Sequence, residues 1–238
     1  LLFLGSGSVI HAFKDEQDIR NMGGVRKKLP FTYIFMLVGT LALTGFPFLS
    51  GFYSKDAIIE FAYLRNSSLG NYAVFIGIFT AFLTSIYSWR LFFKTFHGSY
   101  NNKKIPINET HESPLTMLIP LVFLGIGALF AGFLFKETFI GHHSHAFWKT
   151  SIFFINEIKH NPIPLWLLLI TPILVVISIP LSFYYYISNT KILEEFKNTN
   201  LPLYNFLLNK WYIDELYEFL FVKSSKKIGS LLWKKGDL

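Results

Sequence analysis

The sequence contains no cysteine, and only 16% of its 238 residues are charged. Without thiols the chain forms no disulfide, no thiolate metal site and no cysteine-ligated iron–sulfur cluster. Soluble domains carry about 25% charged residues, so the low charge argues against that class. The chain also lacks a glycine-rich phosphate loop after a strand and a serine–histidine–acid constellation. Nothing in it predicts a nucleotide site, a quinone site, a nucleophile or any other cofactor site.

The sequence is rich in apolar residues: 52% are hydrophobic and 18% are aromatic, and the mean hydropathy is +0.40. These values predict an all-α, polytopic membrane helix bundle. The net charge is +7, but the basic residues lie between apolar runs and form no single aromatic–basic face. We therefore expect the lipid bilayer as a partner, and no nucleic acid.

About 20 apolar residues are needed to cross a hydrocarbon core about 30 Å thick. Five spans are predicted, the first of them partial: Leu1–Ala12, a segment that begins near Pro30, Tyr72–Phe96, Leu115–Phe135 and Leu165–Ile187. The chain starts inside an apolar run, without a methionine or a basic leader region. We therefore expect it to be an internal fragment of a longer protein.

Basic residues are unevenly distributed between the predicted spans. If the spans alternate, the clusters within residues 14–28, 90–104 and 191–197 fall on one side of the membrane, and the other side carries only Arg65, Lys136, Lys149 and Lys159. The positive-inside rule places the first set on the cytoplasmic or matrix side. The aromatic segment Phe147–Ile158, on the other side, is predicted to lie at the membrane interface.

The second span, Phe31–Leu64, is too long for one straight membrane helix. Its 34 residues would extend about 51 Å as a continuous helix. The segment must therefore be broken, and the break is predicted at Gly45, Pro47 and Gly51.

Lys55 and Asp56 follow this break at a predicted membrane depth. A buried lysine can cycle between charged and neutral forms when a nearby charge comes and goes, as a proton relay requires. The N-terminal dipole of the half-helix after the break is expected to disfavour the ammonium. Alternatively, the membrane ends near Gly51 and Lys55 snorkels to the surface. The apolar run Ala57–Leu64, interrupted only by Glu60, argues against this alternative.

Three other polar residues are each compatible with two roles, one in a proton path and one structural. Glu60, one turn after Asp56, is either a proton acceptor on the outer half of a path or an interfacial carboxylate. His11, at the end of the first span, either passes protons from the surface or caps its helix. Thr84 either lines a hydrated groove or packs helices together.

The run GHHSH contains His142, His143 and His145, which superficially resemble a metal-binding tract. Only Glu137 is near enough in sequence to complete a site, whereas ordered metal sites add carboxylates or cysteines in fixed geometry. No metal site is predicted.

The chain is expected to divide near residue 190. Residues 1–190 hold the membrane spans, and residues 191–238 form a connector on the cytoplasmic or matrix side. Within the connector, Tyr204–Trp233 mixes apolar side chains with charges. This pattern predicts an amphipathic helix that lies along the membrane surface or a partner and does not span.

Three runs carry a family resemblance: LLFLGSGSVIHAFKDEQDIRNMGGVRKKLP, GTLALTGFPFLSGFYSKDAI and SIYSWRLFFKTFHG. They resemble the antiporter-like subunits of respiratory complex I, a family related to Mrp-type sodium–proton antiporters. The later run NKWYIDELYEFLFVK is similar to the start of a long lateral helix. That run favours the branch called chain L in bacteria and subunit 5 in mitochondria.

The resemblance implies that residues 1–190 are the C-terminal part of the antiporter-like domain. Lys55 then matches the lysine on the family's second broken helix, in the outer half-channel for protons, and Asp56 matches the acidic residue beside it. His11 lies in the segment that matches the charged end of the preceding helix. Trp211, Tyr212 and Asp214 fall where the lateral helix begins, against the antiporter-like chains M and N.

The resemblance further implies a proton-translocating subunit of NADH:quinone oxidoreductase in a bacterial or mitochondrial inner membrane. NADH, FMN, iron–sulfur clusters and quinone would all be used in other subunits, and this chain would carry no redox chemistry itself. The family's upstream half-channel and its last transmembrane helix are not in this sequence, so we expect no pumping by this chain alone. An Mrp-type sodium–proton antiporter subunit and a scaffold that only anchors partners are the alternatives.

Overall fold

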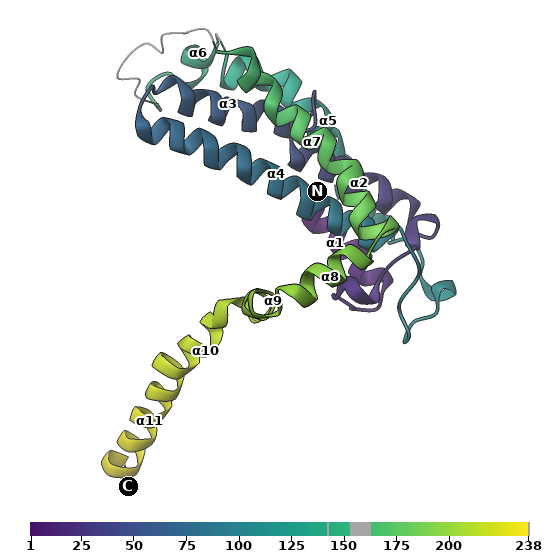
Figure 1. The fold of residues 1–238 in the computed structure, drawn as a ribbon, viewed down its shortest axis with the longest axis vertical. Coiled ribbons are helices and arrows are strands. Elements are labelled where there is room, and N and C mark those ends of the chain that lie inside the picture. Colours follow the sequence, from purple (N-terminus) through teal and green to yellow (C-terminus); the bar gives the residue numbers. More distant parts are fainter. Residues whose placement is uncertain (142, 153–162, 238) are drawn as a thin grey trace. The chain divides into compact units, whose positions relative to one another are not determined.

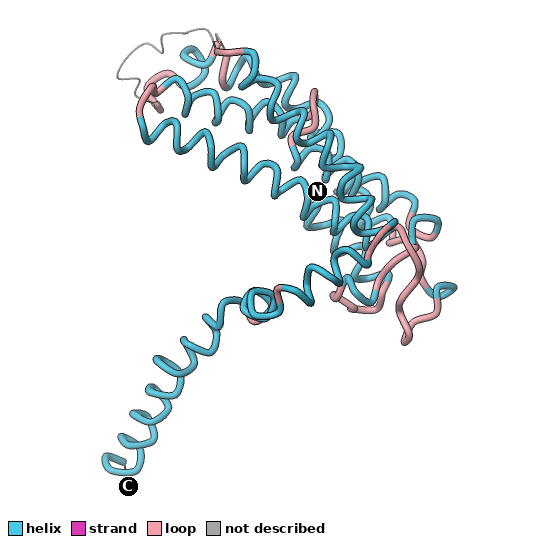
Figure 2. The backbone as a smooth tube through the Cα atoms, in the orientation of Figure 1, coloured by secondary structure: helices cyan, strands magenta, loops and turns pink. Residues whose placement is uncertain are grey.

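In the computed structural model, residues 1–141, 143–152 and 163–237 are described, and they contain helices and no strand (Figures 1 and 2). The chain divides into two units, Leu1–Asn189 and Thr190–Leu238. The first unit is a bundle of membrane-type helices, and the second is a succession of shorter helices.

The first unit contains seven α-helices among its described residues. They are α1 Leu2–Ala12, α2 Pro30–Thr44, α3 Ser50–Leu64, α4 Ser68–Phe96, α5 Leu115–Phe139, α6 Ser144–Trp148 and α7 Leu165–Phe183, which continues as a π-helical turn Tyr184–Ser188. Single 3₁₀ turns occur at Ile19–Asn21, Val25–Lys27 and Ile107–Glu109. The predicted broken span is thus the pair α2 and α3.

Three helices of the described chain are long and apolar enough to cross a membrane: Ser68–Phe96, Leu115–Phe139 and Leu165–Ser188. The apolar helices α1 and α2 are shorter. The prediction of an all-α membrane helix bundle is confirmed. The third span starts at Ser68, before the predicted Tyr72, because the Ser67 hydroxyl caps the helix by accepting a hydrogen bond from the Gly70 N–H at 3.1 Å.

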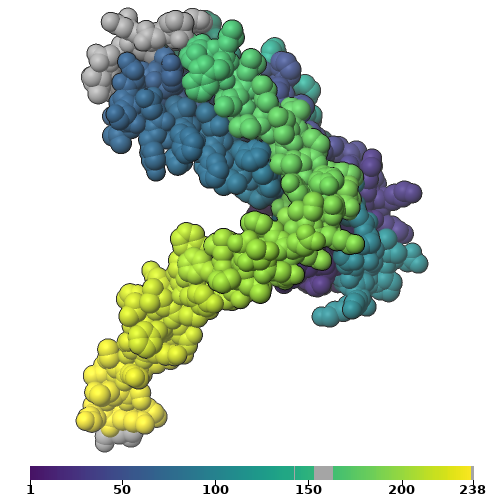
Figure 3. Space-filling model, in the orientation of Figure 1, coloured from purple at the N-terminus to yellow at the C-terminus, as the bar shows by residue number. Residues whose placement is uncertain are grey.

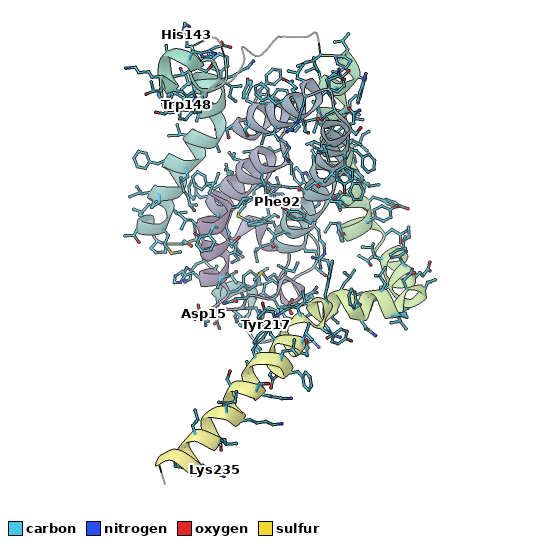
Figure 4. All side chains as sticks on the ribbon, turned by 90° about the vertical axis from the view of Figure 1, so that its left-hand side faces the viewer. Asp15, Phe92, His143, Trp148, Tyr217 and Lys235 are labelled. Carbon is cyan, nitrogen blue, oxygen red and sulfur yellow. The ribbon has the colours of Figure 1, made fainter. Side chains whose placement is uncertain are left out.

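The helices pack in a defined order. α4 contacts α7, α3 and α2, and α5 contacts α2 and α3. The larger hydrophobic core lies where the C-terminal turns of α4 meet α1, α2 and the loop before α2; its largest fully buried side chains include Phe13, Leu29, Met36, Phe92 and Phe96. Phe92 points into the space between these helices (Figure 4).

Two long loops, residues 13–29 and 97–114, meet at one end of the first unit, which we call the long-loop end. The Gly24 N–H donates to the carbonyl of His97 at 3.2 Å. The Lys14 ammonium lies 2.5 Å from the Glu109 carboxylate. The two loops therefore lie on the same side of the bundle, as the alternation of spans requires. Which side of a membrane this is stays a prediction.

The second unit contains α8 Lys191–Thr199, α9 Leu201–Leu208, α10 Ile213–Tyr217 and α11 Lys223–Leu232, with π-helical turns at Glu218–Val222 and Trp233–Asp237. A turn at Lys210–Tyr212 separates α9 from α10, and its three residues have positive φ angles of 51°, 63° and 56°. Three left-handed residues in succession interrupt the helical hydrogen-bond ladder. The predicted stretch Tyr204–Trp233 is therefore two helical pieces, and the longer one begins at Ile213.

The predicted interfacial segment Phe147–Ile158 is described only in part. Phe147 and Trp148 close α6, and the Trp148 indole donates to the Phe139 carbonyl at 3.0 Å, which ties α6 to the end of α5. Figure 4 places Trp148 and His143 together at this end of the first unit. Residues 153–158 lie outside the described residues.

Candidate functional site

The break in the second span begins with a glycine cap. α2 ends at Thr44, and Gly45 follows in the left-handed region at φ +83°. The Gly45 N–H bonds to the Ala42 carbonyl at 3.3 Å, and the Phe46 N–H bonds to the Leu41 carbonyl at 3.0 Å. This pair of bonds is the Schellman motif, in which a glycine ends a helix and satisfies its terminal carbonyls.

Gly51 sets how closely the two half-helices approach. A Cβ on Gly51 would lie 1.8 Å from the Ala42 carbonyl oxygen, so only a residue without a side chain fits there. Gly51 belongs to the first turn of α3, whereas Pro47 lies in the connection between the two helices. The three residues predicted to form the break thus end α2, connect it to α3 and pack α3 against it.

The Lys55 side chain crosses the break. Its Nζ donates to the carbonyls of Leu43 and Thr44, at 3.2 Å and 3.3 Å. These are terminal carbonyls of α2, which have no partner within the helix. The C-terminal end of a helix dipole stabilises a cation. The sequence predicted a disfavoured ammonium from the dipole of α3 alone; the side chain also reaches back to the C-terminal end of α2, a contact that the sequence did not predict.

Further charged groups follow Lys55 along α3. Asp56 is half-buried and interacts electrostatically with both Lys55 and Glu60. Glu60 in turn interacts with Lys136 near the end of α5. The Lys136 ammonium also lies 5.6 Å from the centre of the Tyr53 ring. The charges therefore form a series that starts at the break and ends near the C-terminal end of α5.

The structure adds Thr171, a residue of α7, to this series. Its side chain is buried and hydrogen-bonds to the Asp56 carboxylate. Thr84 does not reach this group, since its hydroxyl donates to the carbonyl of Thr80 in its own helix at 2.7 Å. Thr171 was missed from the sequence, although it is the one polar residue in the run LLLITPIL.

A second polar contact joins α4 and α7 farther along. The hydroxyls of Ser85 and Ser178 hydrogen-bond to each other, and the Ser178 hydroxyl also contacts the Val175 carbonyl at 2.7 Å. One turn on, the buried Ser88 and Ser182 hydroxyls have no hydrogen-bonding partner among the described protein groups. The seam between these two helices is therefore polar at these two levels, although the outer surface of the bundle is apolar.

The remaining predicted site residues lie elsewhere. The exposed His11 is in the last turn of α1, where its ring centre is 6.3 Å from that of His111 at the long-loop end. Trp211 and Tyr212 belong to the turn before α10. Asp214 lies in the first turn of that helix and forms an ion pair with Lys210 at 3.2 Å.

No metal site is evident in the part of the chain that the structure describes. No group of three histidine, aspartate or glutamate residues gathers there. Of the GHHSH run, His143 and His145 are described, and His142 lies outside the described residues.

Two family models together match nearly the whole chain. Residues 1–84 match the family described as NADH:quinone oxidoreductase/Mrp antiporter, transmembrane part, and residues 87–238 match the NADH dehydrogenase subunit 5 C-terminus. The second match covers more than half of the sequence. The chain belongs to the NADH dehydrogenase subunit 5 family. Its resemblance to antiporter-like subunits, and to the chain L and subunit 5 branch, is confirmed.

Relatives of this family align along nearly the full chain. An NADH-ubiquinone oxidoreductase chain 5 of Phytophthora infestans is 46% identical over 92% of this chain and 34% of the relative. That of Marchantia polymorpha is 40% identical over 96% of this chain and 35% of the relative. An NADH-quinone oxidoreductase subunit L of Rhodobacter capsulatus is 34% identical over 100% of this chain and 43% of the relative. The chain is a multi-pass membrane protein that spans less than half the length of these relatives.

Proposed function

We propose that this chain is the C-terminal part of a proton-translocating, antiporter-like membrane subunit of NADH:quinone oxidoreductase, in a bacterial or mitochondrial inner membrane. Membership of the subunit 5 family supports this proposal. NADH oxidation and quinone reduction would occur in other subunits that hold FMN and iron–sulfur clusters. This chain would bind no cofactor and would contact the antiporter-like chains M and N.

The observation that carries the proposal is the position of Lys55. Its ammonium lies on the terminal carbonyls of α2, inside a broken membrane helix, with a carboxylate on the next residue. Ionisable groups at interrupted helices are typical of ion and proton pathways. Because the ammonium is held by backbone carbonyls and not by a direct ion pair, a change in a nearby charge can shift whether Lys55 keeps its proton.

The charged groups that follow Lys55 along α3 define the proposed route for its proton. We assign Asp56 as the first acceptor next to Lys55, with the Thr171 hydroxyl orienting its carboxylate. Glu60 follows one helical turn later and interacts electrostatically with Lys136. The route then leads away from the break towards the end of α3. His11 belongs to the long-loop end and would serve the surface on that side.

Substitution of Lys55 in the full-length parent tests the proposal. Lys55→Ala in the assembled complex should strongly reduce proton pumping into sealed vesicles and the coupled quinone reductase rate. Lys55→Arg keeps a cation at the α2 terminus and separates loss of charge from loss of proton exchange, because arginine stays charged in proteins. It should therefore assemble but pump poorly.

Lys104→Ala is a matched control, since it removes an exposed lysine from the loop after α4. It should leave pumping unchanged. Normal coupling in the Lys55→Ala complex would remove the basis of the assignment.

An Mrp-type sodium–proton antiporter subunit is the second candidate, because the family matched by residues 1–84 includes both kinds of protein. Sodium-dependent proton movement without NADH would favour it.

A purely structural role is the third candidate function. It predicts normal transport in the Lys55→Ala complex and lost assembly when residues 204–233, which include Trp211, Tyr212 and Asp214, are deleted.

A further inference from the structure

An apolar groove of about 550 Å³ runs between α4 and α7 on the surface of the first unit. Figure 3 shows these two helices side by side on one face, α4 in blue and α7 in green. The floor of the groove includes the buried Val74, which packs with Ile59 and Leu167 in a small hydrophobic core. Its walls are apolar or aromatic apart from Asn71 at one end. Such a groove is suited to a hydrocarbon chain.

The length of the groove matches one leaflet of a bilayer. On α4 it extends from Asn71 to Phe82, and on α7 from Trp166 to Leu174. At 1.5 Å per helical residue these distances are about 16 Å and about 12 Å. Half of a hydrocarbon core about 30 Å thick is about 15 Å. The groove thus ends near the middle of the membrane.

The outer end of the groove has the composition of a membrane interface. Tyr63 and Trp166 pack edge to face there, with ring centres 6.4 Å apart. Tyrosine and tryptophan are enriched at the headgroup level of membrane proteins. The opposite end, at Phe82 and Leu174, has no polar side chain. The groove is therefore interfacial at one end and apolar at the other, as a phospholipid has a headgroup at one end and an acyl chain at the other.

A positive group lies at the outer end. Arg65 follows α3 and is exposed, and its Cβ is 3.4 Å from where a Cβ on Gly70 would lie in the first turn of α4. No carboxylate of the described residues forms an ion pair with Arg65. The N-terminus of the long helix α4 adds partial positive charge beside it. Arginine and a helix N-terminus together favour a phosphate group.

We propose that this groove binds one acyl chain of a phospholipid, whose phosphate lies between Arg65 and the first turn of α4. Two separate features support this occupant: the apolar groove of one-leaflet length, and the cation at its interfacial end. The site is independent of Lys55, and it does not require that the chain conduct protons.

Photo-crosslinking in the full-length parent, within its assembled complex, tests the proposal. The complex is reconstituted with a phospholipid that carries a diazirine at the end of one acyl chain, and separately with one that carries it in the headgroup. The chain-end probe should modify the peptides that contain Phe82 and Leu174. The headgroup probe should modify the peptide that contains Arg65 and Asn71. Exposed apolar residues of α5, such as Phe123 and Phe130, provide the background level.

Two variants sharpen the test. Arg65→Gln should lower headgroup labelling at least threefold, whereas Lys149→Gln, which removes another cation between the spans, should not change it. Leu174→Trp fills the inner end and should lower chain-end labelling while the headgroup signal persists. Added inorganic phosphate should compete with neither probe, because the lipid is held by its chain.

Three results would overturn the proposal. Labelling of the groove no stronger than that of α5 would mean ordinary contact with bulk lipid. A crosslink from the groove to another protein chain in place of lipid would mean that a partner helix covers it. Full competition by inorganic phosphate would mean a phosphate site without a lipid chain.

Discussion

The carboxylate of Glu112 caps the helix that contains Thr32, although 80 residues separate the two in sequence. It accepts hydrogen bonds from the N–H and the hydroxyl of Thr32 at 3.3 Å and 2.5 Å, and from the N–H of Phe31 at 2.8 Å. The residue before α2, Leu29, has no side chain that could cap it. A carboxylate at this position satisfies unpaired N–H groups and complements the helix dipole. The loop after α4 thereby fixes the first half of the broken span.

Glu112→Gln should therefore destabilise the first unit by about 1–2 kcal/mol, the usual effect of losing a charged N-cap. Denaturant unfolding of the full-length subunit would measure this change. Glu109→Gln is the matched control, because its partner Lys14 is exposed and surface pairs contribute about 0–1 kcal/mol. Equal effects of the two variants would mean that Glu112 does not act as a cap.

Gly51→Ala should prevent the native approach of α3 to α2. Its Cβ would lie 1.8 Å from the Ala42 carbonyl oxygen, and backbone would have to move to remove that overlap. We expect a loss of assembled complex, measured by blue-native electrophoresis. Gly127→Ala in α5 is the control, since no atom lies within 4 Å of the place that its Cβ would occupy. Normal assembly of Gly51→Ala would contradict the packing described for the break.

Thr171→Val should reduce proton pumping while the fold is kept. The change removes the hydroxyl that contacts Asp56 and nearly preserves the side-chain volume. A loss of about tenfold in rate corresponds to about 1.4 kcal/mol, the size expected for one hydrogen bond to a charged group. The control is Thr84→Val, because the Thr84 hydroxyl bonds only within its own helix. If both variants pump normally, Thr171 has no role in orienting Asp56.

Ser85 and Ser178 should be energetically coupled. Their hydroxyls share a buried hydrogen bond between α4 and α7. A double-mutant cycle with alanine at each position should give a coupling of about 0.6 kcal/mol, a typical value for polar contacts between membrane helices. Additive effects within about 0.3 kcal/mol would mean that the two serines contribute separately.

The sequence was most informative where local chemistry decides structure. The length of Phe31–Leu64 required a break, and glycine and proline located it, because backbone freedom is a property of single residues. The contact between Lys55 and the α2 carbonyls could not be predicted, since it depends on how the chain folds back across the break. Thr171 and Glu112 were missed for a related reason. Each acts on a residue of another helix, and no periodic pattern in a single sequence encodes such a contact.

The second unit also has a feature that the sequence did not predict. Its amphipathic pattern predicted a helix, but the turn at Lys210–Tyr212 contains no glycine. Positive φ angles in lysine, tryptophan and tyrosine have no signature in composition. The start of the longer helix at Ile213 was therefore not apparent from the sequence.

His97 should make the long-loop end sensitive to acid. Burial lowers the pKa of His97 below its ordinary 6.5, and the positive charge of Arg26 lowers the pKa further. Its ring lies among Tyr33, Phe92 and Phe183, and its Nε2 is 3.4 Å from the Tyr33 hydroxyl. In the window below pH 6.5 and above the folded pKa, the unfolded state binds more protons than the folded state. This contribution to stability is therefore present above about pH 6.5 and is lost as the pH falls towards the folded pKa.

Thermal unfolding of the full-length subunit between pH 5 and pH 8 would measure this effect. The His97→Gln variant should lose part of the decrease in Tm on acidification. The matched control His111→Gln removes an exposed histidine from the same end of the bundle, and it should keep the whole decrease. The same pH dependence in wild type and His97→Gln would assign the acid sensitivity to other groups and would leave His97 with a packing role alone.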